Sequence, residues 1–142
     1  MTEDWKADLR NALTGSSAPK ASNIVSLSDF LENTVVPAYQ QIDAELRKHG
    51  RDVKTRVSDA SASLTVIYNG TEELIYRVHG RVFPHGVLPY AEIRFRERNG
   101  LRLISVEQMI RSGKPDYRLA DITVRDVINH FLSEYTKRTV SS

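Results

Sequence analysis

The stretch YRVHGRVFPHGVLPYAEIRFRERNG, residues 76–100, alternates apolar with polar or charged side chains in two runs, which the segment PHGVLP at 84–89 separates. Alternation with a period of two is typical of β-strands that bury one face. An Asn-Gly pair ends the stretch at 99–100 and another precedes it at 69–70. Such a pair between alternating runs is a strong signal for a tight hairpin turn. The stretch therefore predicts two antiparallel strands inside a meander.

The two sides of this hairpin differ in chemistry. With 84–89 as the connecting loop, we expect Phe83 to lie opposite Tyr90. Because side chains alternate along each strand, this register places apolar residues on one face and cations on the other, and a slip by one residue would bury the cations. The residues expected on the buried face are Leu74, Tyr76, Val78, Val82, Ile93 and Phe95.

The opposite face concentrates positive charge. In the expected register Arg77 lies opposite Arg96. His79 lies opposite Arg94, and like charges across a strand pair cost stability unless an anion relieves them. Since guanidinium groups suit carboxylate and phosphate, the face is either a surface for an acidic partner or a solvated face whose arginines pair with acids of the same chain. The candidate binding residues are Arg77, His79, Arg81, Arg94, Arg96 and Arg98.

The 84–89 loop is a second candidate contact. It contains His85, Val87 and Leu88 between two prolines. Apolar side chains at a loop tip are a common contact point for protein partners. The alternative is that Val87 and Leu88 fold back onto the core, and the sequence favours neither arrangement.

Helical patterns flank the strands. Residues 28–50 show an apolar stripe at helical spacing, with Pro37 as either a kink or a break between two helices. A C-terminal helix follows Thr123, which forms a capping-box pattern with Asp126. Between 107 and 121 the pattern is weaker: EQMIRSG fits a helical turn and KPDYRLAD fits a short strand.

The order of these elements predicts an α+β fold. We expect a long N-terminal helix, an antiparallel meander of four or five strands with 51–58 as the fifth, and a C-terminal helix packed on one face of the sheet. We also expect a helical arm at 1–13, a linker at 14–26 and a single α+β domain at 27–142. The arm could clip onto another subunit, which leaves a homo-oligomer open.

Composition limits the classes of function. The chain has 142 residues and no cysteine, which excludes disulfides and thiolate chemistry. It shows no secretory leader pattern and no apolar run near the roughly 20 residues of a membrane helix, so we expect a cytoplasmic protein without a membrane partner. The net charge is only +2. Positive charge is local, however, because residues 77–102 hold six arginines against Glu92 and Glu97.

Signals for catalysis, metals and cofactors are weak. His79 and His85 are six residues apart, and no two histidines have the spacing that ligates a metal on one helix face. The segment RSGKPD lacks the remaining residues of a phosphate-binding loop, and no serine elbow occurs. We therefore expect no metal and no cofactor, and name no catalytic residue.

These observations favour a non-catalytic binding or adaptor module that acts through protein–protein contact, with the cationic face as the surface for an acidic partner. One alternative is a nucleic-acid accessory protein that contacts phosphates through the arginine-rich hairpin, although the sequence lacks the signature of RNA-reading sheets. Another is a small enzyme with a pocket between helix and sheet.

Overall fold

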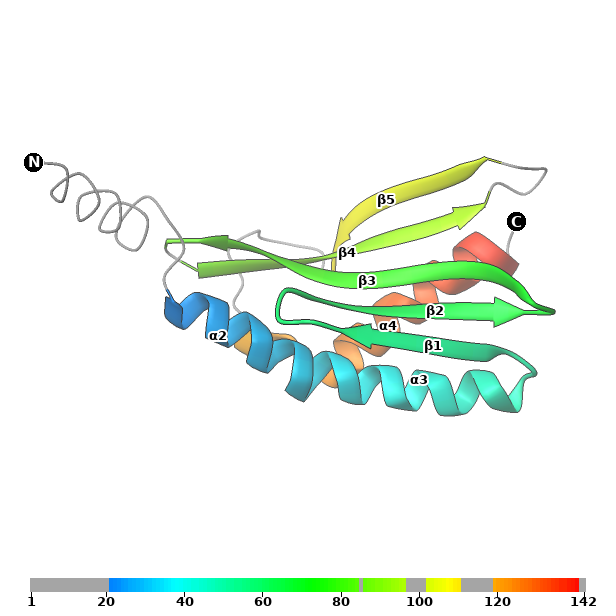
Figure 1. The fold of residues 1–142 in the computed structure, drawn as a ribbon, viewed down its shortest axis with the longest axis horizontal. Coiled ribbons are helices and arrows are strands. Elements are labelled where there is room, and N and C mark those ends of the chain that lie inside the picture. The colour runs from blue at the N-terminus through cyan, green and yellow to red at the C-terminus, as the bar shows by residue number, and fades with distance from the viewer. Residues whose placement is uncertain (1–20, 85, 97–101, 111–118, 141–142) are drawn as a thin grey trace, which may run out of the picture.

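The computed structural model describes residues 21–84, 86–96, 102–110 and 119–140. It confirms the predicted α+β class, because an N-terminal helical segment, a five-stranded antiparallel sheet and a C-terminal helix follow one another along the chain (Figure 1). The expected arm at 1–13 and the first part of the expected linker, 14–20, lie outside the described residues.

The sheet is a meander in which each strand pairs with the next, so the strand order follows the sequence. The additional strand expected at 51–58 is present as β1. The predicted turn at Asn69 and Gly70 has φ values of 53° and 77°, which fit a type I′ hairpin turn. The second Asn-Gly pair lies outside the described residues. The strands are β1 Asp52–Val57, β2 Ser61–Tyr68, β3 Thr71–Phe83, β4 Gly86–Arg96 and β5 Leu103–Met109.

The hairpin of β3 and β4 is longer than the sequence suggested. Phe83 pairs with Gly86 rather than with Tyr90, so the expected loop at 84–89 is wrong and most of it belongs to β4. The early turn adds pairs to the strand ladder and buries Pro89, which an exposed loop would leave in solvent. Since the register moves by four residues, an even number, the predicted division of side chains between two faces holds.

The segment after β4 also differs from the prediction. The helical turn expected in EQMIRSG is wrong over its first three residues, because Glu107–Met109 complete β5 and pair along β4 as far as Tyr90. Leu119–Asp121 form a short 3-10 turn rather than part of a strand. The rest of the expected short strand lies outside the described residues.

The N-terminal helical segment is continuous through Pro37. An α-helix loses a hydrogen bond at a proline, whose ring also clashes with the carbonyl four residues earlier. Here the Val36 N–H donates to the Leu31 carbonyl, so a wider π turn directly precedes the proline and accommodates it. The segment consists of α2 Ala21–Phe30, the π-helical stretch η1 Leu31–Val35 and α3 Val36–Lys48.

This helical segment begins earlier than predicted. α2 starts at Ala21 instead of near Ser28, so the later part of the expected 14–26 linker is helical. The residues ASNIVSL at 21–27 contain neither glycine nor proline, so nothing in them stops a helix. Their small polar side chains resemble a linker in composition only.

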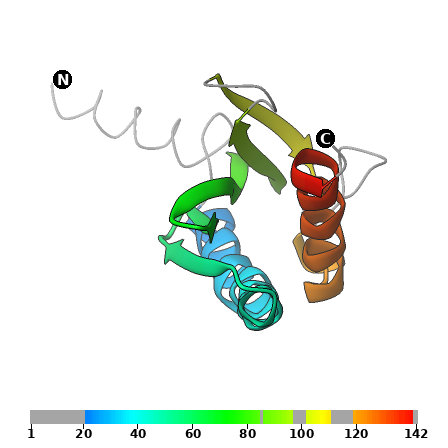
Figure 2. The ribbon, with the colours of Figure 1, turned by 90° about the vertical axis from the view of Figure 1, so that its right-hand side faces the viewer.

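The core lies between the helices and one face of the sheet. Figure 2 shows α3 and α4 (Val124–Tyr135) on the same side of the curved sheet. The Tyr39 hydroxyl of α3 donates to the Ala62 carbonyl of β2 at 2.7 Å. The Tyr76 ring of β3 meets the Phe131 ring of α4 edge-on, with centroids 5.5 Å apart. The predicted core residues are buried (Leu74, Tyr76, Val78, Ile93) or packed partly buried against the core (Val82, Phe95).

α4 begins as predicted. The Thr123 hydroxyl accepts from the Asp126 N–H at 3.1 Å, and the Asp126 carboxylate accepts from the Thr123 N–H at 2.9 Å. This capping box satisfies two N–H groups that the first turn of a helix leaves without a partner. The helix then passes into a π-helical stretch, η3 Thr136–Val140.

Gly80 marks a close approach between α2 and the hairpin. A Cβ atom at this position would lie 2.6 Å from Cδ1 of Leu27 and 2.8 Å from Cγ1 of Val87. We therefore expect Gly80→Ala to lower the free energy of unfolding by about 1–3 kcal/mol, measured by urea unfolding, because it overpacks the core. Combined with Leu27→Ala, which removes the main clash, the substitution should cost less than the sum of the two single costs. Strictly additive costs would contradict this contact.

Candidate anion-binding face

The side of the sheet opposite the core, here called the open face, has no described helix against it (Figure 2). The like-charge pairs predicted on this face are wrong, because the register differs by four residues. Arg77 lies opposite Glu92. His79 lies opposite Tyr90. Opposite charges, rather than opposed cations, therefore organise the centre of the face.

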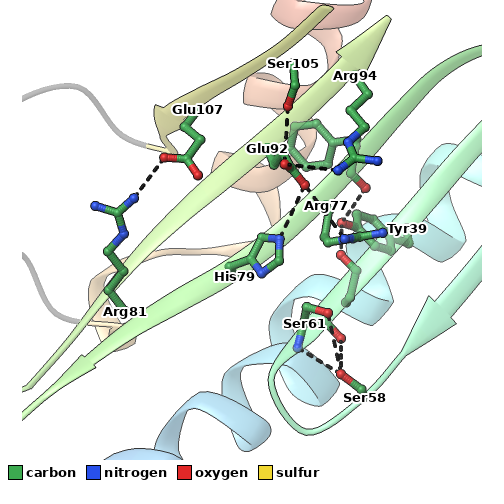
Figure 3. A network of polar contacts seen from close by, with 12 residues as sticks. Tyr39, Ser58, Ser61, Arg77, His79, Arg81, Glu92, Arg94, Ser105 and Glu107 are labelled. Carbon is green, nitrogen blue, oxygen red and sulfur yellow. Dashed lines mark hydrogen bonds and ion pairs between the residues drawn. The ribbon is translucent and has the colours of Figure 1, made fainter. Parts of the chain in front are cut away.

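Glu92 is the centre of this arrangement (Figure 3). Its carboxylate oxygens lie 3.8 Å from Nη1 of Arg77, 3.7 Å from Nε2 of His79 and 3.7 Å from Nη2 of Arg94. Ser105 of β5 donates a hydrogen bond to the same carboxylate at 3.2 Å. Side chains from three neighbouring strands thus meet at one acid. Residues at directly opposed and at diagonal positions of adjacent strands are close enough for such contacts. We call this group the Glu92 cluster: Arg77, His79, Glu92, Arg94 and Ser105.

The arginines of the Glu92 cluster keep their hydrogen-bond donors available. An N–H···O hydrogen bond has a donor–acceptor distance of about 2.7–3.2 Å, so the contacts at 3.7 and 3.8 Å are electrostatic attractions alone. Among the described residues, Nε of Arg94 is buried without a hydrogen-bond partner. The side chains of Arg77 and Arg94 are 36% and 42% exposed. Glu92 therefore holds two guanidinium groups in place by charge alone, and both side chains remain partly exposed to solution, although Nε of Arg94 is buried.

Arg81 differs from these two arginines. Its Nη2 donates to Glu107 at 2.8 Å, and its guanidinium lies over the Tyr90 ring, 4.7 Å from the centroid. The His79 ring stacks on the same tyrosine, with centroids 5.2 Å apart. Burial lowers the pKa of His79, against the opposing attraction of Glu92. At neutral pH the positive charge around Glu92 therefore comes from the arginines.

The other predicted arginines lie apart from the Glu92 cluster or outside the described residues. Arg96, near the end of β4, is exposed and lies opposite Leu103. Arg98 lies outside the described residues. The structure thus brings together Arg77, His79 and Arg94 of the predicted set, with Arg81 beside them on the same face.

The second candidate contact, Val87 and Leu88, does not lie at a loop tip, and the alternative of packing onto the core holds for Val87. Val87 and Leu88 belong to β4 and alternate in direction, as strand residues do. Val87 packs against the core, whereas Leu88 lies opposite Arg81 on the open face. His85 lies outside the described residues.

Sequence reasoning missed three residues that shape the open face: Tyr90, Ser105 and Glu107. A signal for two of them was available. The alternation in LRLISVEQ continues past Val106, so extending the strand by three residues places Ser105 and Glu107 on the side of Arg94. The position of Tyr90 opposite His79 could be found only with the correct register of β3 against β4.

A second polar cluster lies on the core side of the sheet and joins β3, β5 and α4. The Tyr76 hydroxyl lies 2.7 Å from Nδ1 of His130, and Nε2 of the same ring lies 3.4 Å from Oε1 of Gln108. With Oε1 of Gln108 as the acceptor, Nε2 carries the proton and Nδ1 accepts from the tyrosine hydroxyl. Burial lowers the pKa of His130, which keeps the ring neutral. The cluster satisfies buried polar groups, and no activated nucleophile accompanies it among these three side chains.

We expect acid to destabilise the fold through His130. Its pKa is lower in the folded chain than in the unfolded chain, so the unfolded chain takes up the proton first. Stability should therefore fall as the pH drops from about 7 to about 5. Urea unfolding across this range should show a shallower fall for His130→Gln than for the unmodified protein. His49→Gln, at an exposed position after α3, is the control, and equal slopes in all three proteins would contradict the assignment.

Metal ligation finds no support in the described ranges, where no group of three or more histidine, aspartate or glutamate side chains is placed to hold an ion. Within the same ranges, no helix has the length and apolarity required to cross a membrane.

No family model matches the chain, and neither curated proteins nor solved structures give a significant match. Inference about function therefore depends on the contacts within this chain alone.

Proposed function

We propose that the chain is a non-catalytic binding module whose open face receives an acidic, extended segment of a protein partner. The observation that carries this proposal is the Glu92 cluster, in which Arg77 and Arg94 are positioned by a carboxylate that they contact at 3.7–3.8 Å without a hydrogen bond. Each guanidinium can form two parallel hydrogen bonds to an incoming carboxylate, and such charge-assisted bonds are among the strongest that side chains make.

The spacing of the two arginines supports an extended peptide as the ligand. Arg77 lies opposite Glu92, and Arg94 is two residues further along β4, so the arginines occupy diagonal positions. Diagonal neighbours in a sheet are about 7–8 Å apart. In an extended peptide, side chains at i and i+2 point to the same side and are about 7 Å apart. Two carboxylates at alternate positions therefore match the two guanidinium groups.

Several features favour an acidic protein segment over nucleic acid. The net charge is +2, so the long-range attraction for a phosphate backbone is small. Glu92 and Glu107 lie among the arginines of the open face, so the cations do not form the continuous row that a phosphate backbone contacts. The Tyr90 ring already contacts Arg81 and His79, which limits its use as a stacking platform for bases.

Fluorescence anisotropy tests the proposal directly. The probes are a labelled peptide of alternating glutamate and serine, its glutamine counterpart, and mixed single-stranded DNA and RNA of similar length. We expect the glutamate peptide to bind, to weaken as salt rises, and to exceed the other probes in affinity. Failure of the glutamate peptide to bind at low salt would overturn the proposal. Tighter binding of the oligonucleotides would assign the face to nucleic acid instead.

A further inference from the structure

The two edges of the sheet are protected to different degrees. At the β1 edge, Arg47 of α3 donates to the Val53 carbonyl at 3.0 Å and to Oδ1 of Asp52 at 2.9 Å. β1 also carries Lys54 and Arg56, both exposed. Charged side chains on an edge strand, and groups that occupy its free backbone atoms, oppose pairing with another chain.

β5 lacks these protections in the part of the chain that the structure describes. Its sequence, LISVEQM, contains neither lysine nor proline, and Glu107 is its single charged residue. It pairs with β4 alone and lies along the upper border of the sheet (Figure 1), and α4 meets only the core side of its C-terminal half, where His130 contacts Gln108. Leu103 at its start is 55% exposed. The backbone of such a strand is a template for pairing with a further strand.

We propose that β5 pairs antiparallel with β5 of a second copy of this chain, around a two-fold axis at Val106. Val106 is the midpoint of Leu103–Met109, so this register includes the whole strand. It places Val106 opposite the partner's Val106 and Leu103 opposite the partner's Met109. Ser105 then faces the partner's Glu107, and the sheets of the two copies become continuous.

The side chains of β5 select this register. An axis at Glu107 would bring two carboxylates face to face, and an axis at Ser105 would place Leu103 against Glu107. The Val106 register opposes no charge to a like charge or to an apolar residue: apolar pairs lie at its centre and at both ends, and Ile104 faces the uncharged Gln108 of the partner. A two-fold interface must be self-complementary, and the sequence LISVEQM fulfils that condition in this register.

Pairing of one short strand is a small interface, so we expect a dissociation constant of the order of micromolar. The inference goes beyond the proposed function, because it concerns the sheet edge and requires no acidic ligand. Dimerisation would leave the open faces of both copies on the same side, since directly opposed residues of paired strands share a side.

The absence of cysteine from the chain makes the register testable by cross-linking. Sedimentation equilibrium at about 100 µM should give twice the monomer mass of 16.1 kDa. Under mild oxidation Val106→Cys should form a covalent dimer, because the residue faces itself across the axis. Leu103→Cys is the matched control, since the two copies of this residue are about 20 Å apart in the proposed register. The double variant Leu103→Cys/Met109→Cys should form the cross-link, because each cysteine then faces the other across the interface.

A monomer at every concentration would overturn the proposal. So would a dimer in which Leu103→Cys cross-links alone, because that outcome places the axis elsewhere. Val106 is partly buried, and thermal unfolding shows whether its cysteine variant retains the fold. If the Val106→Cys variant does not fold, the double variant Leu103→Cys/Met109→Cys provides the test, since both residues lie on the open face. Cross-linking of the double variant supports the proposed register, and no cross-linking contradicts it.

Discussion

Replacing Arg77 and Arg94 with serine is expected to weaken binding of the acidic peptide by about 10- to 100-fold. Each substitution removes a partly exposed guanidinium group on the open face, and with it the bidentate bonds to one carboxylate of the peptide. Thermal unfolding should change little, because both side chains are partly exposed and their contacts to Glu92 are long. Fluorescence anisotropy measures the affinity, and circular dichroism measures the unfolding.

Glu92→Gln, on the same face, is expected to strengthen binding of the acidic peptide rather than weaken it. The amide keeps the shape of the side chain, and its oxygen still attracts the two guanidinium groups and keeps them in position, but it lacks the negative charge that repels an incoming acid. We expect the affinity for the acidic peptide to rise by about threefold to tenfold, with a steeper dependence on salt. Arg125→Ser with Lys137→Ser, two exposed positions at the C-terminal helical segment, is the control for general loss of charge. Equal losses in the control and in the Arg77/Arg94 variant would show that binding is non-specific.

Phe131→Ala is expected to lower the free energy of unfolding by about 3–5 kcal/mol, as measured by urea unfolding. The side chain is fully buried. Its ring meets Tyr76 of β3 edge-on and stacks on Tyr135 with centroids 5.5 Å apart. Truncation leaves a cavity where α4 meets the sheet, and rigid neighbouring rings fill such a cavity poorly.

Leu132→Ala is the matched control for Phe131→Ala. Leu132 is the next residue in α4 and is 48% exposed, so its truncation should change stability by no more than about 0.5 kcal/mol. A similar cost for both substitutions would mean that α4 is not docked through Phe131. The polar contact between Tyr76 and His130 would then also need another explanation, since it depends on the same placement of α4.

Alternation in the sequence was sufficient to assign side chains to the two faces of the sheet, and to predict four or five strands in antiparallel order, of which the structure has five. Alternation could not fix the register of β3 against β4, because a shift by any even number of residues leaves every side chain on the same face. The face on which the Arg77 side chain lies was therefore predictable, but the residue opposite it was not. Alternation also placed Glu92 on the same face as the arginines, but the incorrect register did not show that it lies opposite Arg77.

The remaining differences have local physical causes. The proline in the N-terminal helical segment allowed a kink or a break, and a π turn directly before it keeps the helical segment unbroken. Residues 21–26 include Ser22, Asn23 and Ser26, which are common in linkers, yet none of the six residues prevents a helix. The spatial meeting of Tyr76, His130 and Gln108 depends on how α4 lies across β3 and β5. No spacing in the sequence contains that information.

The central claim is that the Glu92 cluster on the open face receives the acidic segment. Backbone amide chemical shifts of the 15N-labelled chain, recorded while the glutamate–serine peptide is added, test it most directly. We predict that the largest changes occur at Arg77, Glu92, Arg94 and Ser105 and that they are absent with the glutamine peptide. Largest changes in α3 or α4, or equal changes with both peptides, would contradict the claim.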